Sequence, residues 1–125
     1  GDTVTVGPFE LTFYGKTHAI IHPYYPMFEN LGVRVGDQFF YGGDSLDYPD
    51  VPTTAVLAVP TSGPWSKTSE PMDYMVARTP KIAISVHDFL TSEAGHESQD
   101  RWLRGHAEKH GIVYRHLSVG ESLDV

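Results

Sequence analysis

The first half of the chain contains short alternating or β-branched runs that predict strands. Residues 3–6 and 9–14 form two such runs, separated by a Gly-Pro turn. Residues 18–22 resume an extended pattern after a break. The runs at 33–35 and 38–41 flank Gly-Asp, a dipeptide typical of a two-residue hairpin turn. The first half is therefore expected to be built from hairpins.

The second half alternates apolar strands with helical patterns. Residues 55–59 form a continuous apolar run, typical of a strand buried on both faces. Residues 81–86 form a second strand of this buried type, and 112–117 form a last strand. Helices are expected over 70–78 and from about residue 97 or 98 to 110, with a loop before the second. This order predicts an α/β fold with one mixed sheet of about six or seven strands and both helices on one face.

The two central strands supply the expected core. Its members are Val56, Leu57, Val59, Ile82, Ile84 and Val86. In the second helix, Trp102 and Leu103 are expected to face inward. Because two helices cover only one face of a sheet, the other face would expose an apolar patch larger than monomers usually tolerate. A homodimer that packs sheet against sheet is the simplest way to bury it.

Composition excludes several classes of partner and location. The 125 residues predict a single domain, 1–125. The net charge of −7, without a Lys/Arg cluster, argues against nucleic acid and anionic membranes as partners. The chain has no cysteine, which excludes disulfides and fits a cytoplasmic location. No apolar run is long enough to span a membrane, and Gly1-Asp2 does not begin a signal peptide.

Three residues at strand ends are candidate metal ligands. Asp44 follows a strand through Gly42-Gly43, His87 ends another strand, and His18 lies at the start of a third. Imidazoles and a carboxylate from such positions suit a loop-built site for zinc, manganese or iron, with the carboxylate able to bridge two ions. The alternative is that each is an ordinary polar surface group, since Gly-Gly-Asp-Ser is also common turn composition.

The remaining histidines point to chemistry less directly. His22 lies in a loop rich in proline and tyrosine, where a structural role is favoured. His106 and His110 are four residues apart on one helix face, a spacing that can bind metal, but an amphipathic helix favours solvent-facing side chains there. His96 and His116 show no pattern of their own. Trp65, Tyr24 and Tyr25 could wall a pocket, although packing roles are commoner for such residues.

Several motifs in order resemble the C-terminal half of metallo-β-lactamase-fold hydrolases, similar to ascorbate-6-phosphate lactonase. They are H-A-I-I-H-P (18–23), N-L-G-V-R-V (30–35), F-F-Y-G-G-D-S (39–45), V-L-A-V-P (56–60), G-P-W-S-K (63–67), K-I-A-I-S-V-H-D (81–88) and V-Y-R-H-L-S-V-G-E-S-L-D-V (113–125). The resemblance covers more than four-fifths of the chain. It implies that His18 and His87 are metal ligands and that Asp44 bridges two metals.

The chain also departs from the family. The H-x-H-x-D-H signature, which supplies further ligands from the N-terminal half, does not occur in it. The resemblance therefore implies half of a four-layer αβ/βα sandwich, with zinc, or else manganese or iron, bound by the full fold. Each metal would keep one imidazole and the shared carboxylate here. The isolated chain is thus expected to bind divalent metal weakly, at one site at most, and to hydrolyse nothing at a useful rate.

Two functions remain open from the sequence. The chain is either the C-terminal part of a metal-dependent hydrolase acting on an ester, lactone or phosphoester, or a non-catalytic, self-associating α/β module with a vestigial metal site. The missing layer would come from an N-terminal half or from a homodimer. An H-x-H-x-D-H motif upstream of Gly1 would decide for the hydrolase.

Overall fold

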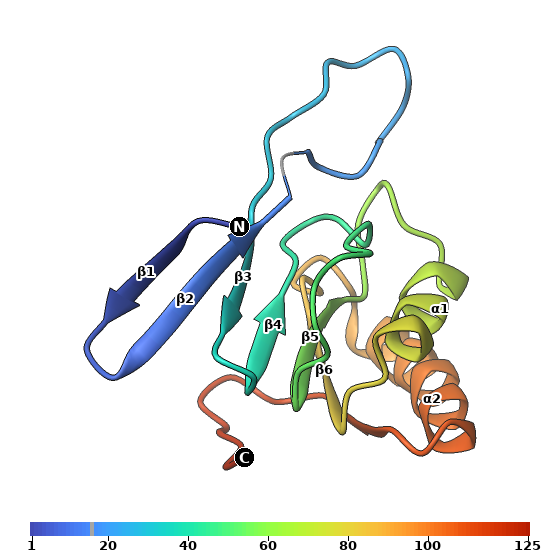
Figure 1. Cartoon of the computed structure of the whole chain (residues 1–125). Coiled ribbons are helices and arrows are strands. Elements are labelled where there is room, and N and C mark those ends of the chain that lie inside the picture. The colour runs from blue at the N-terminus through green and yellow to red at the C-terminus, as the bar shows by residue number, and fades with distance from the viewer. Residues whose placement is uncertain (16) are drawn as a thin grey trace.

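The computed structural model describes residues 1–15 and 17–125. Seven strands form one sheet, and their order in space follows their order in the chain (Figure 1). The strands are β1 (Thr3–Val6), β2 (Phe9–Tyr14), β3 (Gly32–Val35), β4 (Phe39–Tyr41), β5 (Val56–Pro60), β6 (Ile82–Val86) and β7 (Val113–Arg115).

The sheet is mixed, as the sequence predicts. Strands β1 to β4 pair antiparallel, whereas β4 to β7 pair parallel through crossovers. A loop makes the crossover from β4 to β5. The helices α1 (Ser69–Arg78) and α2 (Glu93–Lys109) make the next two and lie on the same face of the sheet (Figure 1). The α/β class and the placement of both helices are confirmed. Among the described residues, no helix combines the length and apolar character needed to cross a bilayer.

The core lies between the parallel strands and the helices. Phe40, Leu57, Ala83 and Tyr114 are consecutive partners across β4 to β7, so their side chains share one face. All four are buried, and they belong to one cluster with residues of both helices. The helical members of this cluster are Tyr74, Met75, Leu103 and Ala107.

The face opposite the helices is only partly covered, which corrects half of the predicted core. Val56, Leu57 and Val59 are buried as predicted. The three apolar residues of β6, namely Ile82, Ile84 and Val86, are each only partly buried. They alternate with Ala83, which faces the helices, and therefore point to the sheet face that neither helix covers.

Helix α2 begins earlier than predicted. It starts at Glu93, because the Ser92 side chain accepts a hydrogen bond from the Gly95 N–H at 3.2 Å and caps it. Ser92 and Gly95 read as loop composition in the sequence, and that prediction was wrong. The inward placement of Leu103 is confirmed, whereas Trp102 is 64% exposed.

Two details of the first half also differ from the prediction. Residues 18–22 form no strand, and the nearest pairing is an isolated antiparallel bridge between Thr17 and Glu29. The hairpin between β3 and β4 has a three-residue loop, 36–38, because Val35 pairs with Phe39. His18 is therefore held by a loop, and its position depends on contacts outside the sheet.

Candidate metal centre

Asp44 is placed by a turn that only glycine accommodates. Gly43 has a φ of +63°, a left-handed conformation that L side chains rarely adopt. A Cβ at this position would also lie 2.2 Å from Oδ1 of Asn30. The same Asn30 oxygen accepts a hydrogen bond from the Asp44 N–H at 2.9 Å. The Gly-Gly pair therefore permits the close approach of the amide that fixes the Asp44 backbone.

The amide of Asn30 links this turn to a buried tyrosine. Its Nδ2 donates to the Gly42 carbonyl at 2.8 Å and to the Tyr48 hydroxyl at 2.7 Å. The Tyr48 hydroxyl in turn donates to the Gly42 carbonyl. Burial raises the pKa of the Tyr48 phenol, so it remains a donor in the neutral range. The turn that carries Asp44 is thus held by a network of side chains from outside the strand.

His18 is tied to Asp44 through the peptide unit of Ala19. The Ala19 N–H donates to the Asp44 carbonyl at 2.7 Å. The Ala19 carbonyl lies 2.6 Å from His18 Nδ1 and can only accept, so Nδ1 carries the proton. The second ring nitrogen, Nε2, is then free to act as a ligand.

His87 is oriented in the same way at the end of β6. Its φ of +59° is uncommon for a residue other than glycine and is of the kind that clusters at functional sites. His87 Nδ1 lies 2.5 Å from the Ser62 carbonyl, which again can only accept a hydrogen bond. Nε2 is therefore the nitrogen left for a ligand role, as in His18.

The structure brings the three predicted ligands together. Nε2 of His18 and Nε2 of His87 each lie 3.2 Å from the same oxygen, Oδ2 of Asp44. A neutral imidazole has one N–H, and in both rings it is used on a backbone carbonyl. Two lone pairs would then face a carboxylate oxygen, which is favourable only with protons or a cation between them. The geometry therefore fits either a cation or protonated imidazoles around a shared carboxylate.

A large cleft opens beside this site. Its volume is about 720 Å³, and its wall includes His18 and Trp65. The Trp65 ring meets the His18 ring edge-on at 6.0 Å between centroids and lies 6.3 Å from the ring of His87. Apolar side chains line the cleft together with three carboxylates, those of Asp47, Glu70 and Asp73. Trp65 thus borders a pocket, one of the two roles that the sequence left open.

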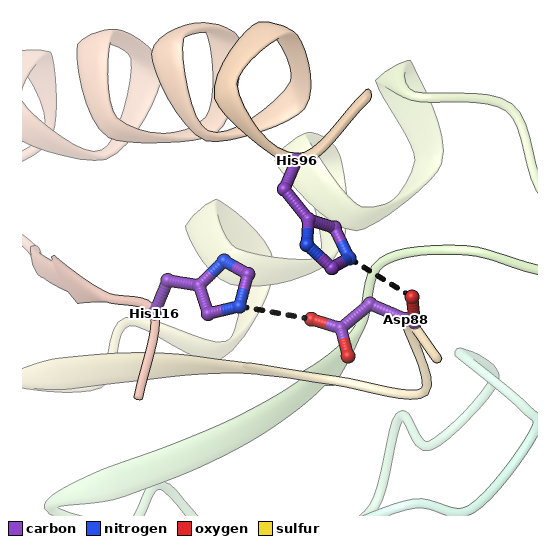
Figure 2. Close-up of side chains that lie close together, drawn as sticks. All are labelled: Asp88, His96 and His116. Carbon is purple, nitrogen blue, oxygen red and sulfur yellow. Dashed lines mark hydrogen bonds and ion pairs between the residues drawn. The ribbon is translucent and has the colours of Figure 1, made fainter. Parts of the chain in front are cut away.

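A second group of side chains that could bind metal comes from residues after His87 in the sequence. Asp88, His96 and His116 each offer a ligand atom, and these atoms all lie within 4.8 Å of one another (Figure 2). Sequence reasoning missed this cluster. The sequence placed His116 inside the last strand, 112–117, whereas β7 ends at Arg115. His116 and Asp88 therefore both follow parallel strands, whose carboxyl ends meet at one edge of a sheet.

The other histidines do not join either cluster. His22 Nδ1 accepts the Tyr24 N–H at 3.2 Å, which fits the structural role expected for it. The rings of His106 and His110 lie 4.9 Å apart along α2. His110 is exposed and His106 half-buried, so the solvent-facing placement is confirmed for His110 alone. Tyr24 is 86% exposed and does not line the cleft beside His18.

Comparison with known proteins places the fold. No family model matches the chain. It is 34% identical over 97 residues to Protein Rv0786c of Mycobacterium tuberculosis, covering 74% of this chain and 45% of that protein. A crystal structure of a proposed metal-dependent hydrolase from Parabacteroides distasonis superposes with a TM-score of 0.65 at 17% identity, covering 93% of this chain and 54% of that one. The chain spans about half the length of each, and shares the fold of the second.

Proposed function

We propose that the chain supplies His18, Asp44 and His87 as metal ligands of a metal-dependent hydrolase of the metallo-β-lactamase superfamily. The observation that supports this is the approach of two Nε2 atoms to one carboxylate oxygen, at 3.2 Å each. In both rings Nδ1 is already bound to a carbonyl, so the arrangement suits a cation. The likeness to a proposed metal-dependent hydrolase adds support through the fold.

In this proposal Asp44 would be shared by two ions, and His18 and His87 would each hold one of them. When bound, such ions would supply an activated water for hydrolysis at an acyl or phosphoryl centre. The mixed imidazole and carboxylate set suits zinc best, with manganese or iron as alternatives. Three ligands do not complete two coordination spheres, so the remaining ones come from outside this chain.

One addition would supply the missing ligands and also complete the partly covered sheet face. We propose that a second sheet packs on the face that carries Ile82, Ile84 and Val86, giving a four-layer sandwich. This sheet would come from an N-terminal half or from a second copy in a homodimer. The coverage of 45% and 54% of two longer proteins favours the first source. A cytoplasmic location stays a prediction from the absence of cysteine.

The cleft indicates the kind of substrate. Its wall combines apolar groups, among them Trp65, with the carboxylates of Asp47, Glu70 and Asp73. Negative charge around a pocket repels an anionic substrate and tolerates a neutral or cationic one. Among the ester, lactone and phosphoester substrates that the family resemblance implies, we therefore propose a neutral ester or lactone.

Calorimetric titration with zinc and manganese tests the ligand assignment. The variants are made in a background that carries His96→Ala and His116→Ala, which removes the second cluster. We expect weak binding that His87→Ala and Asp44→Asn each weaken at least tenfold, with no hydrolysis by the chain alone. His22→Ala, at an exposed histidine outside the site, is the matched control and should leave affinity unchanged.

Two outcomes would contradict the proposal. Affinity that survives both His87→Ala and Asp44→Asn would show that the ligands are wrongly assigned. Absence of any binding, in a chain that is dimeric and folded, would favour the alternative of a non-catalytic, self-associating module with a vestigial site.

A further inference from the structure

We propose that Asp88, His96 and His116 form a second, separate binding site for a divalent transition-metal ion. The three come from different elements: Asp88 follows β6, His96 lies in the first turn of α2, and His116 follows β7. Figure 2 shows His116 directed towards the Asp88 carboxylate and His96 towards the backbone carbonyl of the same residue. Their ligand atoms all lie within 4.8 Å of one another, so small movements of the side chains would let one ion contact all three.

The hydrogen bonds of His116 leave one nitrogen for an ion. His116 Nδ1 lies 2.8 Å from Oδ2 of Asp100, and the Tyr114 hydroxyl donates to Oδ1 of the same carboxylate at 2.7 Å. A carboxylate that accepts the second N–H of a metal-binding histidine is the usual way in which proteins orient such a ligand. Asp100 thus acts as a positioning residue and leaves Nε2 of His116 directed at Asp88.

The spacing between His116 and Asp88 suits an ion better than a direct hydrogen bond. Nε2 of His116 lies 3.5 Å from Oδ2 of Asp88, beyond the usual N–H···O range of about 2.7–3.2 Å. Two ligands bound to a tetrahedral ion at about 2.0–2.1 Å each are separated by about 3.3 Å. The observed gap is close to that separation.

The other two ligands are also held in place. His96 Nε2 donates to the Asp88 carbonyl at 2.9 Å, which assigns the lone pair of the neutral ring to Nδ1. The Ser85 hydroxyl donates to Oδ2 of Asp88 at 2.9 Å. The rings of His96 and His116 meet edge to face, with centroids 4.8 Å apart. Each ligand therefore has a partner that fixes its orientation before an ion arrives.

Two imidazoles and one carboxylate select the class of ion. Nitrogen ligands favour zinc, cobalt, iron or manganese over magnesium and calcium, which prefer oxygen. Three protein ligands leave a fourth position for water. The side chains of His116 and Asp88 are 23% and 22% exposed, so an ion can reach them from solvent. Unlike the site around Asp44, this set is contributed entirely by the present chain.

Cobalt(II) titration followed by visible absorption tests the proposal, because four-coordinate cobalt absorbs far more strongly than the hexa-aqua ion. The background carries Asp44→Asn to disable the first site, and His106→Ala with His110→Ala to remove the paired histidines of α2. We expect one equivalent of cobalt, displaced by zinc. His116→Ala and His96→Ala should each weaken binding at least 100-fold, and Asp100→Asn about tenfold.

The outcomes separate this proposal from the one made above. Circular dichroism shows whether each variant is folded. If His116→Ala is unfolded, His96→Ala, which changes only a helix side chain, tests the site in its place. Failure to bind cobalt in the folded background would overturn the proposal and show that the cluster is a hydrogen-bonded network alone. Cobalt binding that both alanine variants leave unchanged would overturn it as well. Neither result bears on His18 or His87, which are tested with this cluster removed.

Discussion

Replacing Asn30 with alanine would remove the amide that fixes the turn before Asp44. Three hydrogen bonds are lost: one from the Asp44 N–H, one to the Gly42 carbonyl and one to the Tyr48 hydroxyl. A typical intramolecular hydrogen bond contributes about 1 kcal/mol, and an abandoned buried partner adds to the loss. The Gly42 carbonyl keeps its bond from Tyr48, which limits the damage. We therefore expect the free energy of unfolding to fall by about 2–3 kcal/mol.

Urea denaturation measures this change. With a slope of about 2 kcal/mol per molar for a small domain, the midpoint should fall by about 1–1.5 M at an unchanged slope. Gln38→Ala is the matched control, because it removes an exposed amide whose side chain donates only to Asp37 at 3.0 Å. It should change stability by less than about 0.5 kcal/mol. If Asn30→Ala behaved like Gln38→Ala, the network would not hold the turn as described.

Three further results are expected. Leu57→Ala should lower the free energy of unfolding by about 2–5 kcal/mol, and Ile84→Ala by clearly less, because Leu57 is fully buried and Ile84 only partly. Equal urea midpoints for the two variants would contradict the assignment of the two sheet faces. Burial raises the pKa of the Tyr74 phenol above its ordinary value near 10, so the folded state keeps a proton that the unfolded state loses, and the free energy of unfolding should fall as pH rises above about 10. In alkaline unfolding titrations Tyr74→Phe should reduce this dependence on pH, and an unaltered dependence would count against burial of Tyr74 as the cause. Sedimentation at micromolar concentration should show a dimer if no second sheet from elsewhere covers the open face, and a stable monomer would contradict the homodimer.

The sequence predicted most of the fold because its patterns are local. The apolar strands β5 and β6, with one helical segment between them and another after β6, were sufficient to predict a mixed sheet with helices on one face. What the sequence could not show was which face each residue of β6 occupies. β6 carries apolar residues on both faces and only Ser85 is polar, so alternation gives little signal. Ile84 and Ala83 therefore looked equivalent, although only Ala83 packs against the helices.

The candidate site was predictable where ligands follow strands and not where they depend on loops. Asp44 and His87 were placed by the ends of β4 and β6, and the structure brings them within 3.2 Å of each other. His18 was expected on a strand, but a bridge at Thr17 and the peptide unit of Ala19 hold it instead. That the three bind metal remains a prediction from the residue types and the family resemblance.

The cluster at Asp88 escaped prediction for a different reason. His96 was assigned to a loop because α2 was expected to begin after it, so its direction could not be inferred. His116 became meaningful only once β7 was placed beside β6. Spatial neighbours that come from three elements leave no spacing in the sequence that a motif could capture.

The agreement between strand order in space and in the chain has a consequence for how the protein is made. Each strand finds its partner in the strand synthesised just before it, so the sheet can grow at one edge while the chain leaves the ribosome. In the hairpins β1–β2 and β3–β4 the loops that must close are short, which favours rapid folding, whereas the parallel strands β5 to β7 must wait for their crossovers. β7 is added last, and it brings Tyr114 into the core row beside Ala83. A nascent chain that stalls before β7 would leave the apolar face of α2 without one of its partners, and would be a substrate for chaperones until synthesis resumes.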